Sequence, residues 1–397
     1  KYRGNIMTTK ILKKITIILI ILLIVIIITI AYKLYHRSHQ ETPMVQNETK
    51  QETTNKQMGH LQTIVDNQNP QMMQINQYLE QVKFNGTAAV FENGQLKLNK
   101  GYGLQNIQEN KQNQADTLYL IGSSQKFATG LMLKQLESEN KINMNDSVTK
   151  YLPWFKMKQP ITLNQLMLHK SGLFKYKASP NYKNLNEAVH AVQQKGIEPK
   201  FYNKNRYNDG NYLVLSRVIE EVTNKSYKKN FEDRISKPQH LNFTAFFDNS
   251  NFQAYMAKGY KKDGKSGKPL QQYPNVLEQY YGAGNLYMTP SDMGKLILGL
   301  QNNRILNSHI SKPLIHESKT SKYPQPYRYG FYSFADKNRI NGGFFGQVFT
   351  SYFNDKYIVI LGTNYENSDV NNEQKIQHIY NQILKQGGPY NHVGKSY

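Results

Sequence analysis

Two hydrophobic patterns divide this chain. Residues 15–32 form an uncharged run of 18 residues dominated by Ile and Leu, whereas apolar and polar residues are interspersed from about residue 72 onward. As a helix this run would extend roughly 27 Å, about the thickness of the hydrocarbon core of a bilayer. A buried core helix is the alternative, but such a helix seldom lacks polar residues on every face. The pattern therefore predicts a transmembrane helix over 15–32.

Charged residues beside this run predict its orientation. Five basic residues precede it and only two follow it closely, which predicts that residues 1–14 are cytoplasmic and the rest is outside. The sequence after the run offers no small-x-small cleavage site, so we favour an uncleaved signal anchor over a cleavable signal peptide. We therefore expect a single-pass protein of the cell membrane whose extracellular C-terminal domain is associated with the cell wall.

The remainder divides into a polar linker and a folded domain. Residues 33–71 are largely rich in Gln, Asn, Thr and Glu, which is typical of a solvated stalk. The domain is predicted over 72–390, and it begins with a hairpin around Asn93-Gly94, because both turn positions favour positive φ. The further strands are expected at 329–334, 346–353 and 356–362, with Asn354-Asp355 as the last turn.

Helical periodicity occupies the middle and the end of this domain. Apolar residues recur at helical spacing over 127–136 and over 212–222, the latter ending at Asn224, and again over 376–384, with Gly387 as the expected C-cap. Strands at both ends therefore surround a helical middle. This order predicts an α/β (α+β) fold, in which one antiparallel sheet built from both chain ends carries flanking helices and a helical subdomain.

Composition narrows the possible functions. The formal charge is +22, and no cysteine is present, which excludes cysteine-based zinc sites, iron–sulfur clusters and cysteine nucleophiles. Residues 1–37 hold seven basic and no acidic residues, so the rest still carries +15. A cysteine-free ectodomain suits an envelope without disulfide-forming machinery. Its positive charge predicts a polyanionic partner: nucleic acid, anionic lipid or an anionic polymer outside the cell. The predicted extracellular location disfavours nucleic acid and makes an anionic wall polymer the leading partner.

Motifs for nucleotide, dinucleotide and zinc chemistry are missing from the sequence, so we expect no cofactor and no metal. What remains is S-x-x-K, in which one helical turn places a Lys amine beside a Ser hydroxyl. Burial that lowered the Lys pKa would let the neutral amine remove the Ser proton. The four matches are Ser123/Lys126, Ser138/Lys141, Ser147/Lys150 and Ser226/Lys229.

Local context favours Ser123/Lys126. An apolar segment, 118–121, leads into Gly122, and an apolar helix follows through Leu136. Ser123 is thereby expected at a helix N-terminus, where backbone N–H groups favour a developing oxyanion. The alternative is an ordinary N-cap serine with a solvated lysine. The three other matches fall at exposed ends, in a turn or in a basic stretch.

The segment from Gly122 to Lys126 resembles the nucleophile motif of the serine β-lactamase and penicillin-binding-protein superfamily, especially its class C and esterase branch. Further segments resemble that branch's landmarks in the same order, over about residues 75–385. These are Leu166–Leu173 (LLxHxSGL), Tyr207–Tyr212 (Y-x-N), Gly282–Met293 (aGGlxsTaxDm) and Asn341–Gly346, in the place of K-T-G or H-x-G. The resemblance implies a β-lactamase/transpeptidase-like fold.

The resemblance also implies roles for individual residues. Ser123 is the nucleophile, Lys126 its base and Tyr207 a proton shuttle. Asp209 stands where the family usually has Asn, and it would orient the other two or hold a substrate ammonium. His169 is expected to fix a turn. Backbone groups of the oxyanion and substrate-binding site are expected from Ser123, Asn341, Gly342, Gly343 and Phe344.

Taken singly, these residues also have structural interpretations. Tyr207 is one of 29 Tyr, Asp209-Gly210 is typical of a turn, and Gly342-Gly343 of a bulge or a close backbone approach.

Within that branch, three longer stretches resemble the teichoic acid D-alanyl esterases: 207–215, 278–290 and 341–350. This similarity implies an enzyme that removes D-alanine from teichoic acids, binds penicillins weakly and is linked to methicillin resistance. Asn341 replaces the usual Lys or His, which also argues for weak binding of β-lactams. We expect Tyr280, Tyr281 and Tyr287 to border the cleft. The alternatives are a DD-carboxypeptidase or β-lactamase-like enzyme, and a non-catalytic teichoic-acid-binding wall protein.

Overall fold

The computed structural model describes residues 59–366 and 370–387. The predicted cytoplasmic segment, the predicted membrane span over 15–32 and the stalk up to residue 58 lie outside the described residues. Among the helices that are described, none is both long and apolar enough to cross a bilayer.

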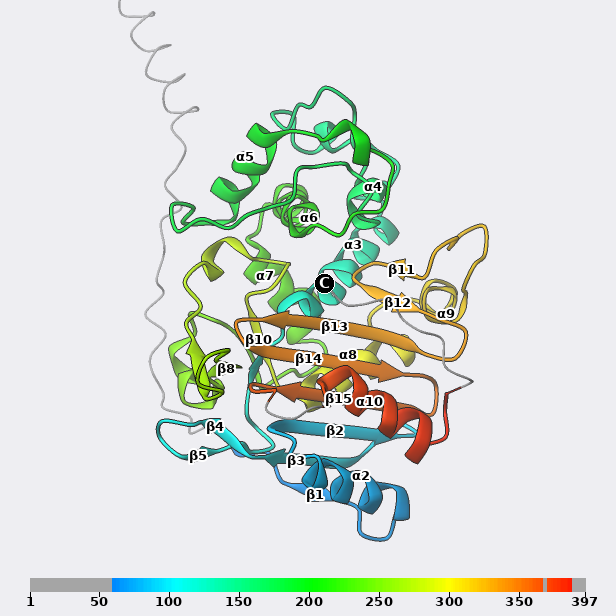
Figure 1. The fold of residues 1–397 in the computed structure, drawn as a ribbon. Helices are drawn as coiled ribbons and strands as arrows, with labels where there is room; N and C mark the ends of the chain where they lie inside the picture. The colour runs from blue at the N-terminus through cyan, green and yellow to red at the C-terminus, as the bar shows by residue number, and fades with distance from the viewer. Residues whose placement is uncertain (1–58, 367–369, 388–397) are drawn as a thin grey trace, which may run out of the picture. The chain divides into compact units, whose positions relative to one another are not determined.

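An eight-stranded antiparallel sheet forms the centre of the fold (Figure 1). Its strand order is β1-β3-β2-β15-β14-β13-β12-β11, so strands from the two ends of the domain meet where β2 pairs with β15. The expectation of one antiparallel sheet built from both chain ends is confirmed. The bounds are β1 Ile64–Val65, β2 Gly86–Glu92, β3 Gln95–Tyr102, β11 Tyr327–Arg328, β12 Phe331–Ser333, β13 Asn338–Phe344, β14 Gln347–Phe353 and β15 Tyr357–Thr363.

Two tight turns fix the register of this sheet. Asn93 and Gly94 join β2 to β3 with φ of 49° and 77°, as predicted, and Phe345 and Gly346 join β13 to β14 with φ of 47° and 78°. Positive φ at both positions matches the right-handed twist of the flanking strands. The second turn places the end of β13 beside the segment that carries Ser123.

Each face of the sheet packs against its own hydrophobic core. Alternate residues of β15 point to opposite faces, so Val359 and Leu361 join one core while Ile358 and Ile360 join the other. Helices α2 (Pro70–Gln81) and α10 (Asn372–His378) cover the first face, and α3 (Gln125–Ser138) and α8 (Pro290–Gln301) cover the second (Figure 1). The long helix α3 is thereby buried between the sheet and the rest of the domain.

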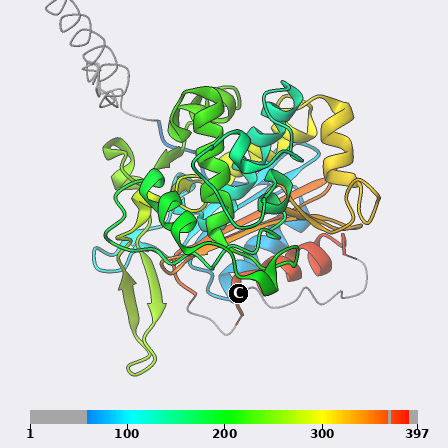
Figure 2. The same cartoon turned by 90° about the horizontal axis from the view of Figure 1, so that it is seen from above.

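A second, largely helical region lies beyond α3 and supplies the other side of the site (Figures 1 and 2). Its helix α6 starts at the N-cap Asn208 and ends at Asn224, whose φ of 53° confirms the predicted stop. The remaining helices are α4 Leu163–Met167, α5 Leu185–Lys195, α6 Asp209–Thr223, α7 Tyr227–Phe231 and α9 Ser308–His316. The short strands are β4 Leu104–Asn106, β5 Lys111–Gln112, β6 Tyr119–Leu120, β7 Thr244–Phe246, β8 Gly259–Lys262, β9 Pro269–Gln272 and β10 Leu286–Met288.

Three predicted boundaries differ from the structure. The folded region begins before residue 72, with β1 and the start of α2. The sequence did not reveal β1 because only two residues pair with β3, too few to produce an alternating pattern. The strand predicted over 329–334 starts in a turn, since Tyr329 and Gly330, with φ of 45° and 84°, link β11 to β12, and β12 covers only Phe331–Ser333. The last helix changes to a π-helical turn at Ile379 and ends before Lys385, which takes the positive φ expected at Gly387.

Close backbone contact holds α3 against the β11–β12 hairpin. A Cβ at Gly130 would lie 2.0 Å from the carbonyl oxygen of Tyr329, and one at Gly330 would lie 2.1 Å from the backbone of Lys126. Only glycine allows this approach. The two contacts position the turn of α3 that carries Lys126.

We expect Gly130→Ala to lower the free energy of unfolding by at least about 2 kcal/mol, because the added methyl group overpacks a buried backbone contact. In an exposed helix the same change would stabilise the protein. The midpoint of urea-induced unfolding measures the effect, and Gly264→Ala is the control because a Cβ there meets no atom within 4 Å. An unchanged midpoint for Gly130→Ala would contradict the close packing.

Candidate active site

Ser123 lies in a tight turn at the start of α3. The 3₁₀ turn η1 (Gly122–Ser124) leads directly into the helix, and Gly122 has a φ of 53°. A Cβ on Gly122 would lie 3.0 Å from the backbone nitrogen of Gly343. A side chain here would both strain the backbone and press on β13.

Side chains next to Ser123 tie this turn to β14 and to the start of β10. The hydroxyl of Ser124 donates to the carbonyl of Phe349 at 3.0 Å. The Oε1 atom of Gln125 accepts the backbone N–H groups of Asn285 and Leu286 at 2.7 and 3.1 Å. Ser124 and Gln125 are fully buried, whereas Ser123 is partly exposed. The turn is therefore held by its neighbours, and the Ser123 hydroxyl remains accessible.

The structure brings the four predicted catalytic residues together. Lys126 Nζ lies 2.8 Å from Ser123 Oγ and 2.7 Å from Asp209 Oδ1. Tyr207 donates its hydroxyl to Ser123 Oγ at 2.7 Å. Lys126 comes from α3, whereas Asp209 is the first residue of α6 and Tyr207 precedes it. Ser123 Oγ thus accepts from two donors that come from different elements.

Lys126 is a buried ammonium. Its third N–H points to the carbonyl of Ala283 at 3.3 Å, so all three donors are used. Burial acts to lower the pKa of Lys126, but the carboxylate of Asp209 and the hydroxyl of Tyr207 outweigh it, and the pKa is raised. Burial alone therefore does not produce the neutral amine that could remove the Ser123 proton. The resting amine is charged because an anion lies beside it.

Tyr207 is supported by His169, whose role the sequence did not indicate beyond a turn. His169 does have a φ of 56°, as a turn residue would. Its Nδ1 accepts from the side chain of Asn211 at 2.9 Å, so Nε2 carries the proton and donates to Tyr327 at 3.0 Å. Burial lowers the pKa of His169 well below its usual value. The neutral ring lies 4.4 Å from the Tyr207 ring, centre to centre, and limits its movement.

Two glycines of β13 lie against η1, the turn that carries Ser123 and is called the nucleophile turn below. A Cβ at Gly342 would lie 2.1 Å from the carbonyl oxygen of Ile121 and 2.7 Å from the backbone nitrogen of Ser123. Gly343 is exposed beside Gly122. The predicted pair of glycines is therefore needed for a close backbone approach, which brings peptide groups of β13 next to Ser123.

The side chain of Asn341 points to the other face of the sheet. Successive residues of a strand face opposite sides, and position 342 faces Ser123. Asn341 accepts a hydrogen bond from Thr350 at 2.8 Å, and Thr350 in turn accepts one from Asn372 of α10. Only the backbone of Asn341 therefore lies near the site.

Of the three tyrosines expected to border the cleft, Tyr280 is the one near Asp209. The Tyr280 ring lies 4.9 Å from that of Phe344, and the nearby charge of Asp209 adds to the burial that raises its pKa. Tyr281 packs against Phe246 in the core, and Tyr287 is buried. The structure thus places Tyr280, with Phe344 packed against it, near Asp209.

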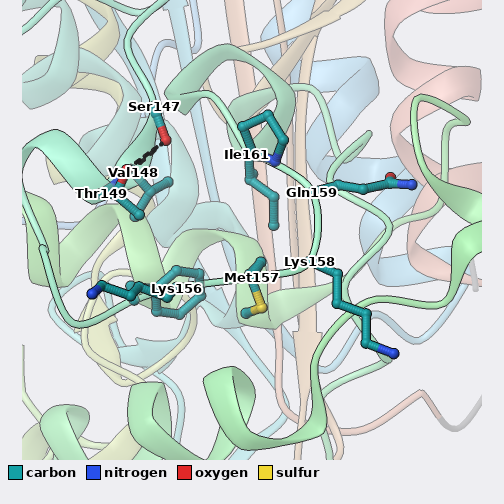
Figure 3. A pocket seen from close by; sticks show the side chains of 10 residues that line it. Ser147, Val148, Thr149, Lys156, Met157, Lys158, Gln159 and Ile161 are labelled. Atoms are coloured by element: carbon teal, nitrogen blue, oxygen red, sulfur yellow. Dashed lines mark hydrogen bonds between the residues drawn. The ribbon is translucent and has the colours of Figure 1, made fainter.

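The other S-x-x-K segments lack this arrangement, because each lysine pairs with an acid instead of its serine. Lys141 pairs with Glu139, Lys150 with Asp146 and Lys229 with Asp233. Figure 3 shows Ser147 at a cavity of about 310 Å³, where its hydroxyl lies 2.9 Å from that of Thr149. The residues that line this cavity include none of the predicted catalytic residues. Ser123/Lys126 is the pair whose surroundings suit catalysis.

This fold and this site are those of a serine β-lactamase-like protein. The family model described as Beta-lactamase matches residues 74–382, and the chain belongs to this family. The family resemblance inferred from the sequence motifs is confirmed.

Particular relatives narrow the comparison. The chain is 53% identical over 359 residues to the teichoic acid D-alanine hydrolase of Staphylococcus aureus (strain NCTC 8325 / PS 47), covering 90% of this chain and 89% of the relative. The crystal structure of FmtA from Staphylococcus aureus aligns with a TM-score of 0.81 at 54% identity, covering 86% of this chain and 97% of that one. A penicillin binding protein from Bacillus halodurans aligns at 21% identity with a TM-score of 0.64, covering 77% of this chain and 98% of that one, which shows a shared fold.

We expect Asp209→Asn to slow acylation of Ser123 at least about 100-fold at neutral pH, because the charged Lys126 then has no carboxylate to which it can pass a proton. This is the usual size of a general acid–base contribution. Without the anion the pKa of Lys126 falls, so the neutral amine becomes more abundant as pH rises. Activity should therefore recover partly at alkaline pH. Intact-mass kinetics with a serine-directed acylating probe, followed across pH, measures this.

Asp146→Asn is the matched control, because it removes the partner of Lys150 at the same 2.7 Å distance without touching Ser123. Acylation at an unchanged rate in Asp209→Asn at neutral pH would show that the ion pair plays no part in activating the serine.

Proposed function

We propose that this protein is a membrane-anchored, extracellular serine esterase that removes D-alanine from teichoic acids through an acyl-enzyme. The observation that carries the proposal is the set of contacts among Ser123, Lys126, Tyr207 and Asp209, in a chain 53% identical to a teichoic acid D-alanine hydrolase over nine-tenths of its length. A role in cell-wall modulation and methicillin resistance is part of the same proposal.

Acylation begins with a proton relay. Lys126 passes one proton to Asp209 as it accepts the proton of Ser123, so the base stays charged while the serine oxygen attacks the ester carbonyl. The 2.7 and 2.8 Å contacts of Nζ support this relay. Once Nζ has passed a proton to Asp209 along their hydrogen bond, its lone pair faces Ser123 Oγ and can take the serine proton. Burial raises the pKa of Tyr207, so its hydroxyl stays protonated and donates to the forming alkoxide.

Collapse of the tetrahedral intermediate releases a hydroxyl of the polymer. Tyr207 donates its proton to the leaving oxygen and is reprotonated by Lys126, which recovers its own proton from Asp209. Water then hydrolyses the D-alanyl-enzyme by the same relay. The backbone N–H of Ser123 and that of the Gly343–Phe344 segment are the proposed oxyanion donors, supported by the close approach of Gly342 to Ser123.

The substrate preference follows from two departures from the family motifs. Asp209 uses Oδ1 for Lys126, and no hydrogen bond within the described part of the chain uses Oδ2; about a third of its side chain is exposed. The free oxygen suits the ammonium of D-alanine. The Asn341 position supplies no cation for a β-lactam carboxylate, and its side chain is bonded to Thr350. We therefore propose that β-lactams acylate Ser123 only weakly.

A DD-carboxypeptidase or β-lactamase-like activity is the second candidate. The fold shared with a penicillin binding protein is the observation in its favour. A non-catalytic wall-binding protein is less well supported, because it would not require a serine held by two donors.

We expect Ser123→Ala to reduce D-alanine release from D-alanylated teichoic acid at least about 1,000-fold and to abolish the covalent adduct, because the nucleophile is removed. Enzymatic assay of D-alanine and intact mass after exposure to a D-alanyl ester and to a β-lactam measure both. Ser147→Ala should retain full activity, since its S-x-x-K lysine pairs with Asp146.

The same measurements separate the candidate functions. Faster turnover of peptidoglycan peptides or β-lactams than of D-alanyl esters would favour the second candidate. D-alanine release that survives in Ser123→Ala would show that the nucleophile is another residue, and no adduct with any acylating substrate would favour a binding protein.

We also propose that residues 15–32 anchor the protein in the cell membrane with the catalytic domain outside, supported by the charge asymmetry of the sequence. Deletion of residues 1–32 should move the protein from carbonate-washed membranes to the soluble fraction. Protease added to intact cells should digest the domain of the full-length protein.

Deletion of residues 38–58 is the matched control for this test, because it shortens the chain while keeping the apolar run. A 1–32 deletion that stays in washed membranes, or a full-length domain protected from protease, would contradict the proposed topology.

A further inference from the structure

The β8–β9 hairpin projects from the body of the domain and is strongly basic. It is the yellow-green pair of strands that extends away from the rest in Figure 2. Residues 258–273 contain five lysines and one aspartate, a formal charge of +4. The lysines are Lys258, Lys261, Lys262, Lys265 and Lys268.

This charge is not neutralised by the protein itself. Within residues 59–366 and 370–387, no salt bridge involves any of the five lysines, and all except Lys258 are exposed. The carboxylate of Asp263 turns back to the hairpin tip, where it accepts from the backbone and the hydroxyl of Ser266. The hairpin therefore presents free ammonium groups to solvent.

The base of the hairpin adjoins the active site. A Cβ at Gly259 would lie 2.0 Å from the carbonyl oxygen of Phe345, and one at Gly346 would lie 2.6 Å from that of Tyr260. Gly343 of the same β13–β14 segment contacts Gly122. Gly343 precedes Phe345 by only two residues, so the base of the hairpin lies beside the segment that meets the nucleophile turn, and the lysines continue outward from there.

A cavity of about 240 Å³ lies where the hairpin meets the body. Gln271, Gln272 and Tyr273 line it from the hairpin side, and Gln253 and Gln347 are among the residues opposite. Tyr273 is 71% exposed. Amide groups beside an exposed aromatic ring suit hydroxyl-bearing units, whereas the lysines beyond them suit phosphates.

We propose that the β8–β9 hairpin binds the polyol-phosphate backbone of the teichoic acid whose D-alanyl esters Ser123 attacks. Several consecutive phosphates lie along the lysines while an ester of the same chain enters the site. The inference rests on the proposed function and assigns the hairpin to it as the polymer-binding surface. Charge complementarity is its basis, so binding weakens as salt screens the lysines.

The test is a variant in which Lys261, Lys262, Lys265 and Lys268 are all changed to Gln. We expect its KM for D-alanylated polyglycerol-phosphate teichoic acid to rise about tenfold with kcat within about twofold, since the loss of charge weakens capture of the polymer only. Hydrolysis of D-alanine methyl ester should be unchanged. The KM of the native protein should rise with salt, and that of the variant should barely respond.

The control variant changes four exposed lysines outside the hairpin, Lys83, Lys312, Lys319 and Lys385, to Gln. It removes the same charge, so an equal rise in KM would show a net-charge effect and overturn the proposal. An unchanged polymer KM in the hairpin variant, or an equal loss on D-alanine methyl ester, would also overturn it. So would loss of binding to phosphatidylglycerol vesicles with an unchanged polymer KM, because the hairpin would then serve a membrane surface.

Failure of the proposed function can be told apart from failure of this inference. If the native protein releases D-alanine from neither ester, the proposed function is wrong. Retention on immobilised polyglycerol-phosphate stripped of D-alanine then decides the role of the hairpin. Retention of the native protein but not of the hairpin variant supports polymer binding, and equal retention of both overturns it.

Discussion

The buried ion pair between Lys126 and Asp209 is the interaction on which the rest of the site depends. A lysine without solvent access loses its charge unless an anion and hydrogen-bond acceptors replace water. Here Asp209, Ser123 and the carbonyl of Ala283 take all three N–H groups. Because Asp209 is the first residue of α6, the N-terminus of α6 must lie beside the turn of α3 that carries Lys126. The helical region is thereby positioned against the sheet by a charge requirement as well as by packing.

Backbone contacts supply the rigidity that this ion pair needs. The contacts at Gly130 and Gly330 hold the part of α3 that carries Lys126. The contact at Gly342 of β13 holds the turn that precedes α3. These contacts leave no room for a Cβ, so the backbone of α3 and of the turn before it packs directly against the neighbouring strands. Ser123, its base and the peptide groups of β13 are therefore kept at fixed distances, which is the condition for stabilising a developing oxyanion without reorganisation.

Local signals predicted the elements whose conformation is set within a few residues. The Asn93-Gly94 turn and the Asn224 stop both require positive φ, and the sequence offers residues that tolerate it. The break at Tyr329-Gly330 was missed because a tyrosine seldom takes positive φ, and the contact of Gly330 with α3 is what selects it. The short strand β1 was missed because it is stabilised by its partner β3 and has no pattern of its own.

The sequence by itself determined the candidate nucleophile, the mixed fold with its two-ended sheet, and the cationic character of the domain. Ser123 could be chosen among four similar pairs because its context, an apolar lead, a glycine and a helix, is local. Only the tertiary structure decided the charge of Lys126 and the face to which Asn341 points. The pKa depends on a carboxylate 83 residues away, and the direction of a strand side chain depends on register against its neighbours. Both are set by long-range contacts that no local pattern contains.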